Sequence, residues 1–340
     1  MPEGSRKTTK KKSFFKQQKM MRKVLLALSP ALVGGIYFFG WRVLALVVWV
    51  MVVGALVEYL MAKRRGDPLT ESCLVTCLLF SLSLPPTIPF WMAAVGIVVA
   101  LTFGKELFGG FGRNVFNPAI VGRGFLYVCF PPAMTGSFAP IHSGGLAGLA
   151  KWGPKTMSDG ISALTAATPM WTRRDFDYAT PLHNLFFGGI GGAPQGRILA
   201  AGSIGEVSAL LLIIGGAYLL YTKTAAWRLV VGSLGGAVAA TLIFRFLPGG
   251  GSVPPVPWTL CSGAMLYACL FMVTDPISAP KDKLTQLVYS AFIGVMIVFL
   301  RWRAVFAGGV AFAILLGNTV GPSVEIGLKA LQARWKGAAQ

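Results

Sequence analysis

The sequence has few acidic, histidine and cysteine side chains, which most metal sites and hydrolytic sites require. Among 340 residues there are 12 Asp and Glu, 2 His and 5 Cys. The two histidines, His142 and His183, lie in one segment without a nucleophile elbow, which argues against a hydrolase. Cys73 and Cys77 share a helix face but have no partners at zinc or iron–sulfur spacing. Any electrons or groups that pass through this protein therefore require an organic cofactor.

Charge is also scarce over most of the chain. Charged residues make up 13% and hydrophobic residues 54%, whereas soluble domains carry about a quarter charged residues. This composition predicts a polytopic membrane protein. About a third of the net charge of +19 lies ahead of the first apolar run, in a basic cytoplasmic tail over residues 1–21. Because no basic face interleaved with aromatic side chains accompanies this tail, it indicates a surface for anionic lipid and not for nucleic acid.

Ten apolar segments reach or approach the length of about 20 residues that a spanning helix needs. They are 22–40, 43–62, 70–85, 89–107, 116–133, 206–222, 227–247, 257–274, 285–301 and 303–320. The sequence therefore predicts an all-α fold with about ten transmembrane helices, several of them interrupted by Pro or Gly.

The distribution of Lys and Arg between these spans predicts the topology. Alternate connections carry positive charge, as at 63–65 and 281–283, whereas the opposite connection at 84–89 carries none. Arg301 and Arg303, at the boundary between the last two spans, are the exception. By the positive-inside rule, both termini are cytoplasmic.

The spans divide into a first membrane half, 22–133, and a second, 206–320, which a cytoplasmic tail over 321–340 follows. Between the halves, 134–205 forms one long extracytoplasmic loop rich in Gly, Pro, Ser and Thr. Loops of this length are usually functional or disordered. Five spans on either side suggest two inverted halves with interrupted helices, which is a plan common among transporters.

Segment 104–126, GKELFGGFGRNVFNPAIVGRGFL, holds the densest group of special residues. Gly109 and Gly110 permit positive φ and a close approach of the backbone to a ligand, and Asn114 and Asn117 can bond loop backbone. These four residues are candidates for binding a cofactor or substrate. A tightly packed turn between helices would explain the same residues, so both interpretations stay open.

Four carboxylates lie in or at the ends of predicted spans: Glu58, Glu106, Glu206 and Asp275. Because an ionisable group inside the bilayer is costly, each is a candidate for an ion path. The structural alternatives are a pairing of Glu106 with Lys105, a helix N-terminal role for Glu206 and a helix-ending role for Asp275.

Five motifs occur in order along the chain: LVTCLLFSLSLPPTIPFW (74–91), GKELFGGFGRNVFNPAIVGRGFL (104–126), GSIGEVSAL (202–210), FMVTDPISA (271–279) and GVAFAILLGN (309–318). With them the sequence resembles the NqrB/RnfD family from about residue 20 to 325. NqrB is a membrane component of Nqr, the sodium-translocating NADH:quinone oxidoreductase, and RnfD is its counterpart in Rnf, the related ferredoxin:NAD oxidoreductase. The first two motifs are closer to the Nqr form, and the short segment before the first span is closer to the Rnf form.

In this family a threonine in a pattern like Ser/Thr-x-Ala-Thr holds FMN through a phosphoester bond. The run Thr165-Ala166-Ala167-Thr168 fits this pattern, so the resemblance implies Thr168 as the anchor. An Asp-Gly pair usually lies six residues before the anchor, and here Asp159 lies six before Thr165 and nine before Thr168. Thr165 is therefore a rival anchor, and Thr180 in a second Ala-Thr-Pro run is a third. A plain solvated turn is the structural alternative.

The resemblance implies an electron-transfer subunit of an Nqr-type or Rnf-type translocase in the bacterial inner membrane, which couples electron flow to sodium or proton transport. It implies the other subunits of such a complex and a flavin transferase as partners. Quinone, or ferredoxin and NAD, would exchange electrons through the complex, and riboflavin is a second cofactor in some Nqr-type members. The alternative from another class is a flavin-free secondary transporter with broken helices.

Overall fold

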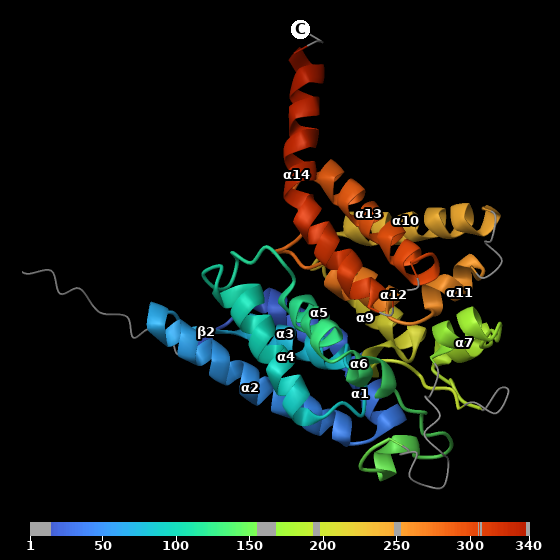
Figure 1. Ribbon diagram of the computed structural model, residues 1–340. Helices are drawn as coiled ribbons and strands as arrows, with labels where there is room; N and C mark the ends of the chain where they lie inside the picture. Colours follow the sequence, from blue (N-terminus) through green and yellow to red (C-terminus); the bar gives the residue numbers. More distant parts are fainter. Residues whose placement is uncertain are drawn as a thin grey trace, which may run out of the picture.

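The computed structural model describes residues 15–154, 168–192, 198–247, 253–304, 306 and 308–337, and it confirms the prediction of an all-α membrane protein (Figure 1). The elements before the long central segment are β1 (Phe15–Lys16), α1 (Lys19–Phe39), α2 (Arg42–Arg65), β2 (Leu69–Thr70), α3 (Glu71–Leu82), α4 (Phe90–Leu101), η1 (Thr102–Glu106), α5 (Pro118–Cys129) and α6 (Pro131–Gly136). The central segment contains η2 (Ala147–Ala150), α7 (Pro169–Asp175), α8 (Leu182–Phe187) and η4 (Ile204–Glu206). The later elements are α9 (Ala209–Tyr221), α10 (Trp227–Phe246), α11 (Val256–Cys261), α12 (Met265–Tyr267), η6 (Ala268–Met272), α13 (Lys283–Trp302) and α14 (Gly309–Gly337).

Five helices of the described chain are long and apolar enough to cross a membrane, namely α1, α2, α10, α13 and α14. The other predicted spans contain shorter or interrupted helices. α3 ends at Leu82 because Pro85 and Pro86 follow, and a residue before proline is disfavoured in the helical conformation. The last span begins at Gly309 rather than at 303, and its helix continues past 320 through most of the predicted C-terminal tail.

Two π-helices interrupt the regular helical structure. α4 continues directly into the π-helix η1, and α12 continues into the π-helix η6. The segment between α11 and α12 contains Gly263, whose φ of +55° is one that L side chains rarely adopt. π-helices are rare and often lie at functional sites, so these two mark places to search for one.

The two halves use the same packing pattern. In the first half α4 packs against α2 and α5, and in the second α13 packs against α10 and α14. In each half, therefore, the fourth predicted span contacts the second and fifth, which favours the suggested two-half organisation. Figure 1 shows α10, α13 and α14 side by side, and α2, α4 and α5 together on the other side of the molecule.

Glycines bring α10 and α13 into direct backbone contact. A Cβ atom added at Gly294 would overlap the Ser233 carbonyl oxygen, and one added at Gly236 would overlap the Ala291 carbonyl oxygen. Such close approach through small residues is the usual way in which helices associate within a membrane. It fixes the position of α13, which carries Arg301 near its C-terminal end.

The predicted loop 134–205 packs onto the helices in its described parts. Met134, Ile141, Leu185, Ile190 and Leu199 are buried in the same hydrophobic core as the membrane helices. This segment therefore forms a folded cover over one end of the helical body, and α7 lies within it (Figure 1).

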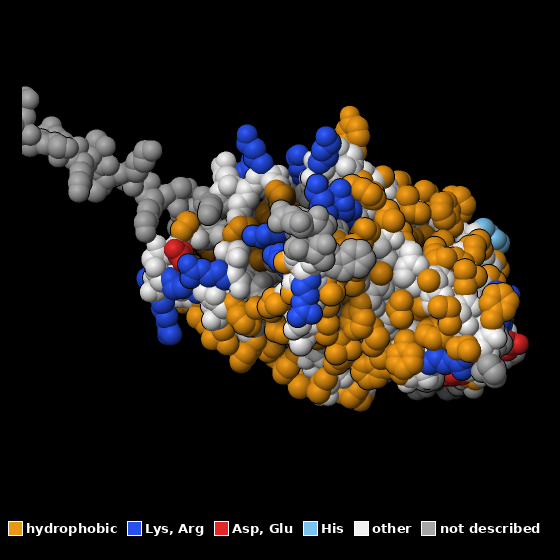
Figure 2. All heavy atoms as spheres, turned by 90° about the horizontal axis from the view of Figure 1, so that it is seen from above, with side chains coloured by type: hydrophobic (Ala, Val, Ile, Leu, Met, Phe, Trp, Pro, Cys, Tyr) orange, Lys and Arg blue, Asp and Glu red, His pale blue; other side chains and the backbone are white. Residues whose placement is uncertain are grey.

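The surface carries the composition of a membrane protein. Figure 2 shows hydrophobic side chains over a broad continuous area, with most Lys and Arg side chains in the left half of this view. Exposed apolar residues lie along several of the long helices, among them Val33 of α1, Val52 of α2 and Ile243 of α10. Side chains of this kind are stable on a helix surface when lipid covers it.

Candidate functional site

A cavity of about 290 Å³ lies between α5, α7 and the C-terminal end of α13. We name it the Thr168 cavity. Its wall includes Arg123, Tyr127, Thr135, Phe138, Thr168, Met170, Trp171, Arg174, Gly202, Glu206, Gly263, Arg301 and Phe306. The volume is close to the lower end of the range of about 300–1,000 Å³ for small-molecule sites, and the mixture of aromatic and cationic side chains is typical of them.

Two arginines in the wall of this cavity are buried. Arg123 of α5 is 7% exposed and Arg301 of α13 is 4% exposed. Arg123 donates to the Ser203 hydroxyl at 3.3 Å, and Arg301 donates to the Ser262 carbonyl at 3.2 Å. Within the described chain, neither guanidinium lies within salt-bridge distance of a carboxylate.

A buried charge without an ionic partner is costly, so two such cations favour an anion in the cavity. Glu206 also lines the wall, and its Oε1 accepts a hydrogen bond from the Ser203 backbone N–H at 2.6 Å. Arg174, which also lines the cavity, is paired with Asp175. Arg123, Arg301 and Glu206 then leave the wall with one net positive charge. A single negative charge would balance it.

Thr168 lies at the N-terminal end of α7, in the wall of the same cavity. It is half-buried, and its Oγ1 accepts a hydrogen bond from the Trp171 backbone N–H at 3.4 Å. Nearby, Arg174 donates to Asp175 at 2.7 Å and lowers the pKa of that carboxyl. Thr168 therefore lines a pocket rich in cationic and aromatic side chains, which suits an anionic aromatic group.

The other two candidate anchors differ from Thr168. Thr165 lies outside the described residues. Thr180 is 1% exposed, and its hydroxyl has no hydrogen-bond partner among the described residues. Its backbone carbonyl accepts a hydrogen bond from the Trp258 indole at 2.9 Å. Burial makes Thr180 inaccessible to a modifying enzyme in this structure.

A second cavity of about 60 Å³ lies between the two halves, beside both π-helices. We name it the Asp275 cavity. It is mostly apolar, and its polar lining includes Ser72, Thr76, Lys105, Asn114, Asn117, Thr274 and Asp275. The structure thus brings three predicted site residues, Asn114, Asn117 and Asp275, to one place. Asp275 accepts hydrogen bonds from the Ile277 N–H at 3.2 Å and the Ser278 hydroxyl at 2.9 Å, so its carboxylate stabilises the turn that follows η6.

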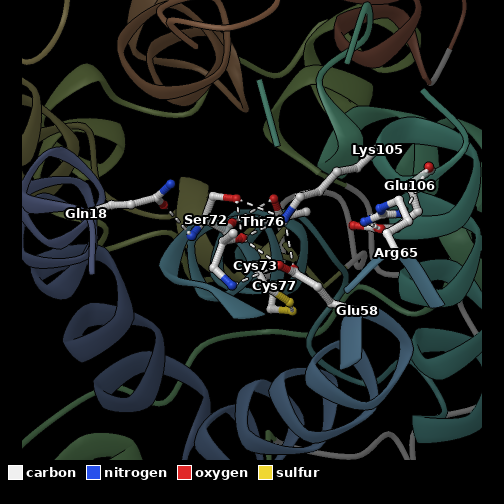
Figure 3. A network of polar contacts seen from close by, with 10 residues as sticks. Gln18, Glu58, Arg65, Ser72, Cys73, Thr76, Cys77, Lys105 and Glu106 are labelled. Atoms are coloured by element: carbon white, nitrogen blue, oxygen red, sulfur yellow. Dashed lines mark hydrogen bonds and ion pairs between the residues drawn. The ribbon is translucent and has the colours of Figure 1, made fainter. Parts of the chain in front are cut away.

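Beside the Asp275 cavity, Lys105 and Glu58 form a buried ion pair at 2.8 Å (Figure 3). Their side chains are 3% and 2% exposed. The structural alternative in which Glu106 pairs with its neighbour Lys105 is wrong. The π-helix η1 directs Lys105 toward Glu58 of α2, while Glu106 pairs with Arg65 near the end of the same helix.

A third cavity lies on the other side of this ion pair, and we name it the Gly110 cavity. It is polar and has a volume of about 420 Å³. Its lining includes Glu58, Arg65, Thr70, Glu106, Gly109, Gly110, Phe111 and Arg113. Gly109 and Gly110 have φ of +98° and +90°, so the turn itself requires glycine at both positions. The structure therefore supports the tight-turn interpretation of these two glycines and also places them at a cavity wall.

Comparison with known proteins places the chain in a family. Residues 8–331 match the model of the NQR2, RnfD, RnfE family. The chain belongs to this family. The resemblance drawn from the five motifs is therefore confirmed.

Among curated members of the NQR2, RnfD, RnfE family, the chain is 36% identical over 279 residues to the NqrB component of the Na(+)-translocating NADH-quinone reductase of Azotobacter vinelandii. That match covers 81% of the chain and 64% of the relative, so the chain spans less than two thirds of that protein's length. It is 33% identical over 312 residues to the RnfD component of the proton-translocating ferredoxin:NAD(+) oxidoreductase complex of Clostridium ljungdahlii, covering 90% of the chain and 88% of the relative. An NqrB protein of Neisseria meningitidis is 35% identical over 303 residues, covering 87% of the chain and 67% of the relative.

The motifs of the sequence do not single out Arg123, Arg301 or Lys105 as site residues. A signal for them was present, because an ionisable side chain within a predicted span is unusual. Arg123 lies inside the predicted span 116–133, and Arg301 was already an exception to the charge pattern. Only the packing of α5, α13 and α7 shows that the two arginines share one cavity with Thr168.

Proposed function

We propose that this multi-pass membrane protein is an electron-transfer subunit of an ion-translocating complex and that it carries FMN on Thr168 through a phosphoester bond. The observation that carries the proposal is that Thr168 lines one cavity together with the buried residues Arg123 and Arg301. Two relatives, a component of a sodium-translocating reductase and a component of a proton-translocating oxidoreductase, support the same class of function.

The residues present fit a flavin phosphate. A phosphate that joins Thr168 to a flavin keeps one negative charge, which matches the single net positive charge of the buried wall. Arg123 and Arg301 are both multidentate donors suited to phosphate oxygens. Trp171, Tyr127 and Phe138 offer ring surfaces for a planar aromatic system. When bound, the flavin would supply the capacity to accept and donate electrons, and the protein would orient it and limit its exposure to water.

The cation path is the second part of the proposal. Glu58, Glu106 and Asp275 lie at or between the Asp275 and Gly110 cavities, and Glu206 lies at the Thr168 cavity. Candidate ion-path residues therefore lie at both ends of the helical body. By the positive-inside rule, we place the Thr168 cavity on the extracytoplasmic side and both termini in the cytoplasm of a bacterial inner membrane.

The proposed partners follow from this placement. The other subunits of an Nqr-type or Rnf-type complex would exchange electrons with the flavin, and a flavin transferase would attach it. Quinone, or ferredoxin and NAD, would be the redox partners of the complex. The Asp275 cavity, at about 60 Å³, is too small to hold a riboflavin, so we assign no site to that second cofactor. The basic segment 1–21 would contact anionic lipid.

In-gel fluorescence tests the function directly. The full chain is produced together with a matching flavin transferase, denatured, separated and illuminated with ultraviolet light. A fluorescent band that survives denaturation is expected, because only a covalent flavin remains with the chain. A dark band from protein that the transferase could reach would support the flavin-free transporter with broken helices.

A further inference from the structure

The Lys105 ammonium is held by a shell of oxygen atoms within the membrane domain. Its Nζ lies 2.8 Å from Glu58 Oε2, 3.0 Å from Thr70 Oγ1 and 2.9 Å from Ser72 Oγ. An ammonium has three N–H donors, and these three oxygens satisfy all of them. Figure 3 shows Lys105, Glu58 and Ser72 converging on one point from different parts of the chain.

The oxygen shell is supported independently of the lysine. Glu58 Oε1 accepts hydrogen bonds from the Thr70 backbone N–H at 3.0 Å and from the Thr70 hydroxyl at 2.5 Å. The Thr70 and Ser72 hydroxyls lie 3.0 Å apart, and Thr76 bonds the Ser72 carbonyl at 3.0 Å. All these oxygens belong to α2, β2 and α3, whereas Lys105 reaches them from η1. The lysine could therefore withdraw and leave the shell in place.

The lysine also has a space into which it could withdraw. Lys105 and Ser72 line the Asp275 cavity, while Glu58 and Thr70 line the Gly110 cavity. Phe111 lines both cavities, so the Lys105–Glu58 pair is part of the wall between them. A lysine that turned away from Glu58 would enter a cavity that offers a second carboxylate, Asp275.

A carboxylate and two hydroxyls form a ligand set that hard cations prefer. The net charge of the oxygen shell decides which cations it can bind. The shell contributes the single negative charge of Glu58, so a monovalent cation would leave it neutral, as the lysine does. A divalent cation would leave one positive charge in a buried site, which is costly.

We propose that Lys105 occupies a monovalent-cation site formed by Glu58, Thr70 and Ser72, and that an alkali cation replaces its ammonium when the lysine turns toward Asp275. Lys105 thus acts as a tethered competitor of the transported cation. This inference rests on the proposed function, because it names the site at which the transported cation would bind. Its test is cation binding at equilibrium, without electron transfer, so its failure is distinguishable from a failure of the flavin assignment.

The experiment compares the full-length wild-type chain with Lys105→Met and with Glu58→Gln/Lys105→Met in detergent. Methionine keeps an apolar stem of similar length but removes the ammonium. Binding of radioactive sodium and the unfolding midpoint are measured in NaCl, in KCl and in choline chloride of equal ionic strength. For Lys105→Met we expect stoichiometric sodium binding and a rise of the midpoint in the alkali salts relative to choline. The double variant, which lacks the Glu58 charge, should show neither.

A folded Lys105→Met chain that neither binds sodium nor responds to alkali salts would overturn the proposal. If this variant cannot be recovered in choline, recovery in NaCl or KCl supports a cation site. If Lys105→Met cannot be recovered in any of the three salts while the double variant folds well, the proposal is overturned.

A measurement on the wild type does not depend on any variant folding. Reductive methylation of Lys105, followed by mass spectrometry, should increase with sodium or potassium concentration, because the cation displaces the ammonium from the shell. The same modification at Lys329, which is exposed and pairs with Glu325, is the internal control. Methylation of Lys105 that stays constant from choline to concentrated alkali salt would also overturn the proposal. Covalent flavin, scored on the same samples, tests the proposed function separately.

Discussion

The backbone N–H of Asn117 donates a hydrogen bond to Oδ1 of Asn318 at 3.2 Å and so connects α5 to α14 across 201 residues of chain. The Asn117 side chain caps α5 by accepting from the Ala119 N–H at 3.1 Å, and it donates to the Met272 carbonyl at 3.3 Å. Asn318 in turn donates to the Tyr289 hydroxyl at 2.7 Å. This buried polar junction joins the two halves of the protein at the Asp275 cavity.

Asn318→Ala should lower the stability of the purified chain. The substitution leaves the Asn117 N–H and the Tyr289 hydroxyl buried without their partner, and one such group costs about 1–3 kcal/mol. We expect a lower unfolding midpoint in a fluorescence-monitored melt. Thr319→Ala is the matched control, since Thr319 is exposed and bonds only its own helix at Leu315. Equal midpoints for the two variants would show that the junction is not a stabilising contact.

Thr168→Ala should abolish covalent FMN, whereas Thr165→Ala and Thr180→Ala should retain it. The reason is that Thr168 alone among the described candidates combines an accessible hydroxyl with a cationic cavity. Mass spectrometry of the peptide that contains residues 156–173 detects the adduct directly. An FMN adduct that persists in the Thr168 variant would move the anchor to Thr165 or Thr180.

Arg301→Gln should leave FMN attached but lower its reduction midpoint potential. Removing a buried positive charge makes uptake of an electron less favourable. We expect a decrease of some tens of millivolts, since about 30 mV corresponds to about 1.4 kcal/mol in a two-electron couple. Spectroelectrochemical titration measures the potential. Arg245→Gln, at an exposed position near the end of α10, removes the same charge away from the cavity. A potential that changes equally in both variants would argue against a role for Arg301 at the flavin.

Gly110→Ala should reduce turnover of the assembled complex more than Gly112→Ala. Both glycines have φ of +90°, so both substitutions carry similar backbone strain of about 1–2 kcal/mol. A Cβ at Gly110 would also lie 2.9 Å from Arg65 Nη2 and would move Arg65 away from Glu106, whereas Gly112 has open space around it. FMN should remain on Thr168 in both variants. Turnover and in-gel fluorescence provide the two readouts, and similar turnover in the two variants would exclude a role for the Arg65–Glu106 contact.

Cysteine labelling tests the proposed orientation. In a background with Cys129→Ser, an impermeant maleimide added to intact cells should label a cysteine introduced at Ser143 but not one at Lys281. Both positions are exposed, and they lie in connections that the charge pattern assigns to opposite sides. Permeabilised cells should label both. The reverse pattern in intact cells would invert the topology.

The sequence predicted the helical class and the approximate location of each span, because apolar runs of this length leave few alternatives. It could not predict the exact lengths of the helices. α9 begins at Ala209 rather than at 206 because Ser203 and Glu206 form a capping box around the short helix η4. α3 is short because the two prolines that follow Leu84 end it.

The site was predicted in part. The sequence predicted Thr168 as a candidate anchor because the Thr-Ala-Ala-Thr pattern is local and can be read directly from neighbouring residues. The pairing of Lys105 with Glu58, 47 residues away, depends on the wider turn of η1, and neighbours in sequence gave the wrong partner. The meeting of Arg123 and Arg301 beside Thr168 depends on how α5, α7 and α13 pack, and no local pattern contains that information.

The shortness of α3 has a consequence for the membrane potential. Its 12 residues, at about 1.5 Å each, extend about 18 Å, compared with a hydrocarbon core of about 30 Å. The helix begins at the Lys105 shell, and just beyond its end the Leu84 carbonyl accepts a hydrogen bond from Ile204, next to the segment that carries Glu206. Water that entered the Gly110 cavity at one end and the Thr168 cavity at the other would bring the aqueous phases closer together, and the membrane voltage would fall over this shorter path. The electric field along α3 would then be about 1.7 times stronger than across lipid. A cation that crossed there would gain the full energy of about 2.3 kcal/mol per 100 mV within a few helical turns.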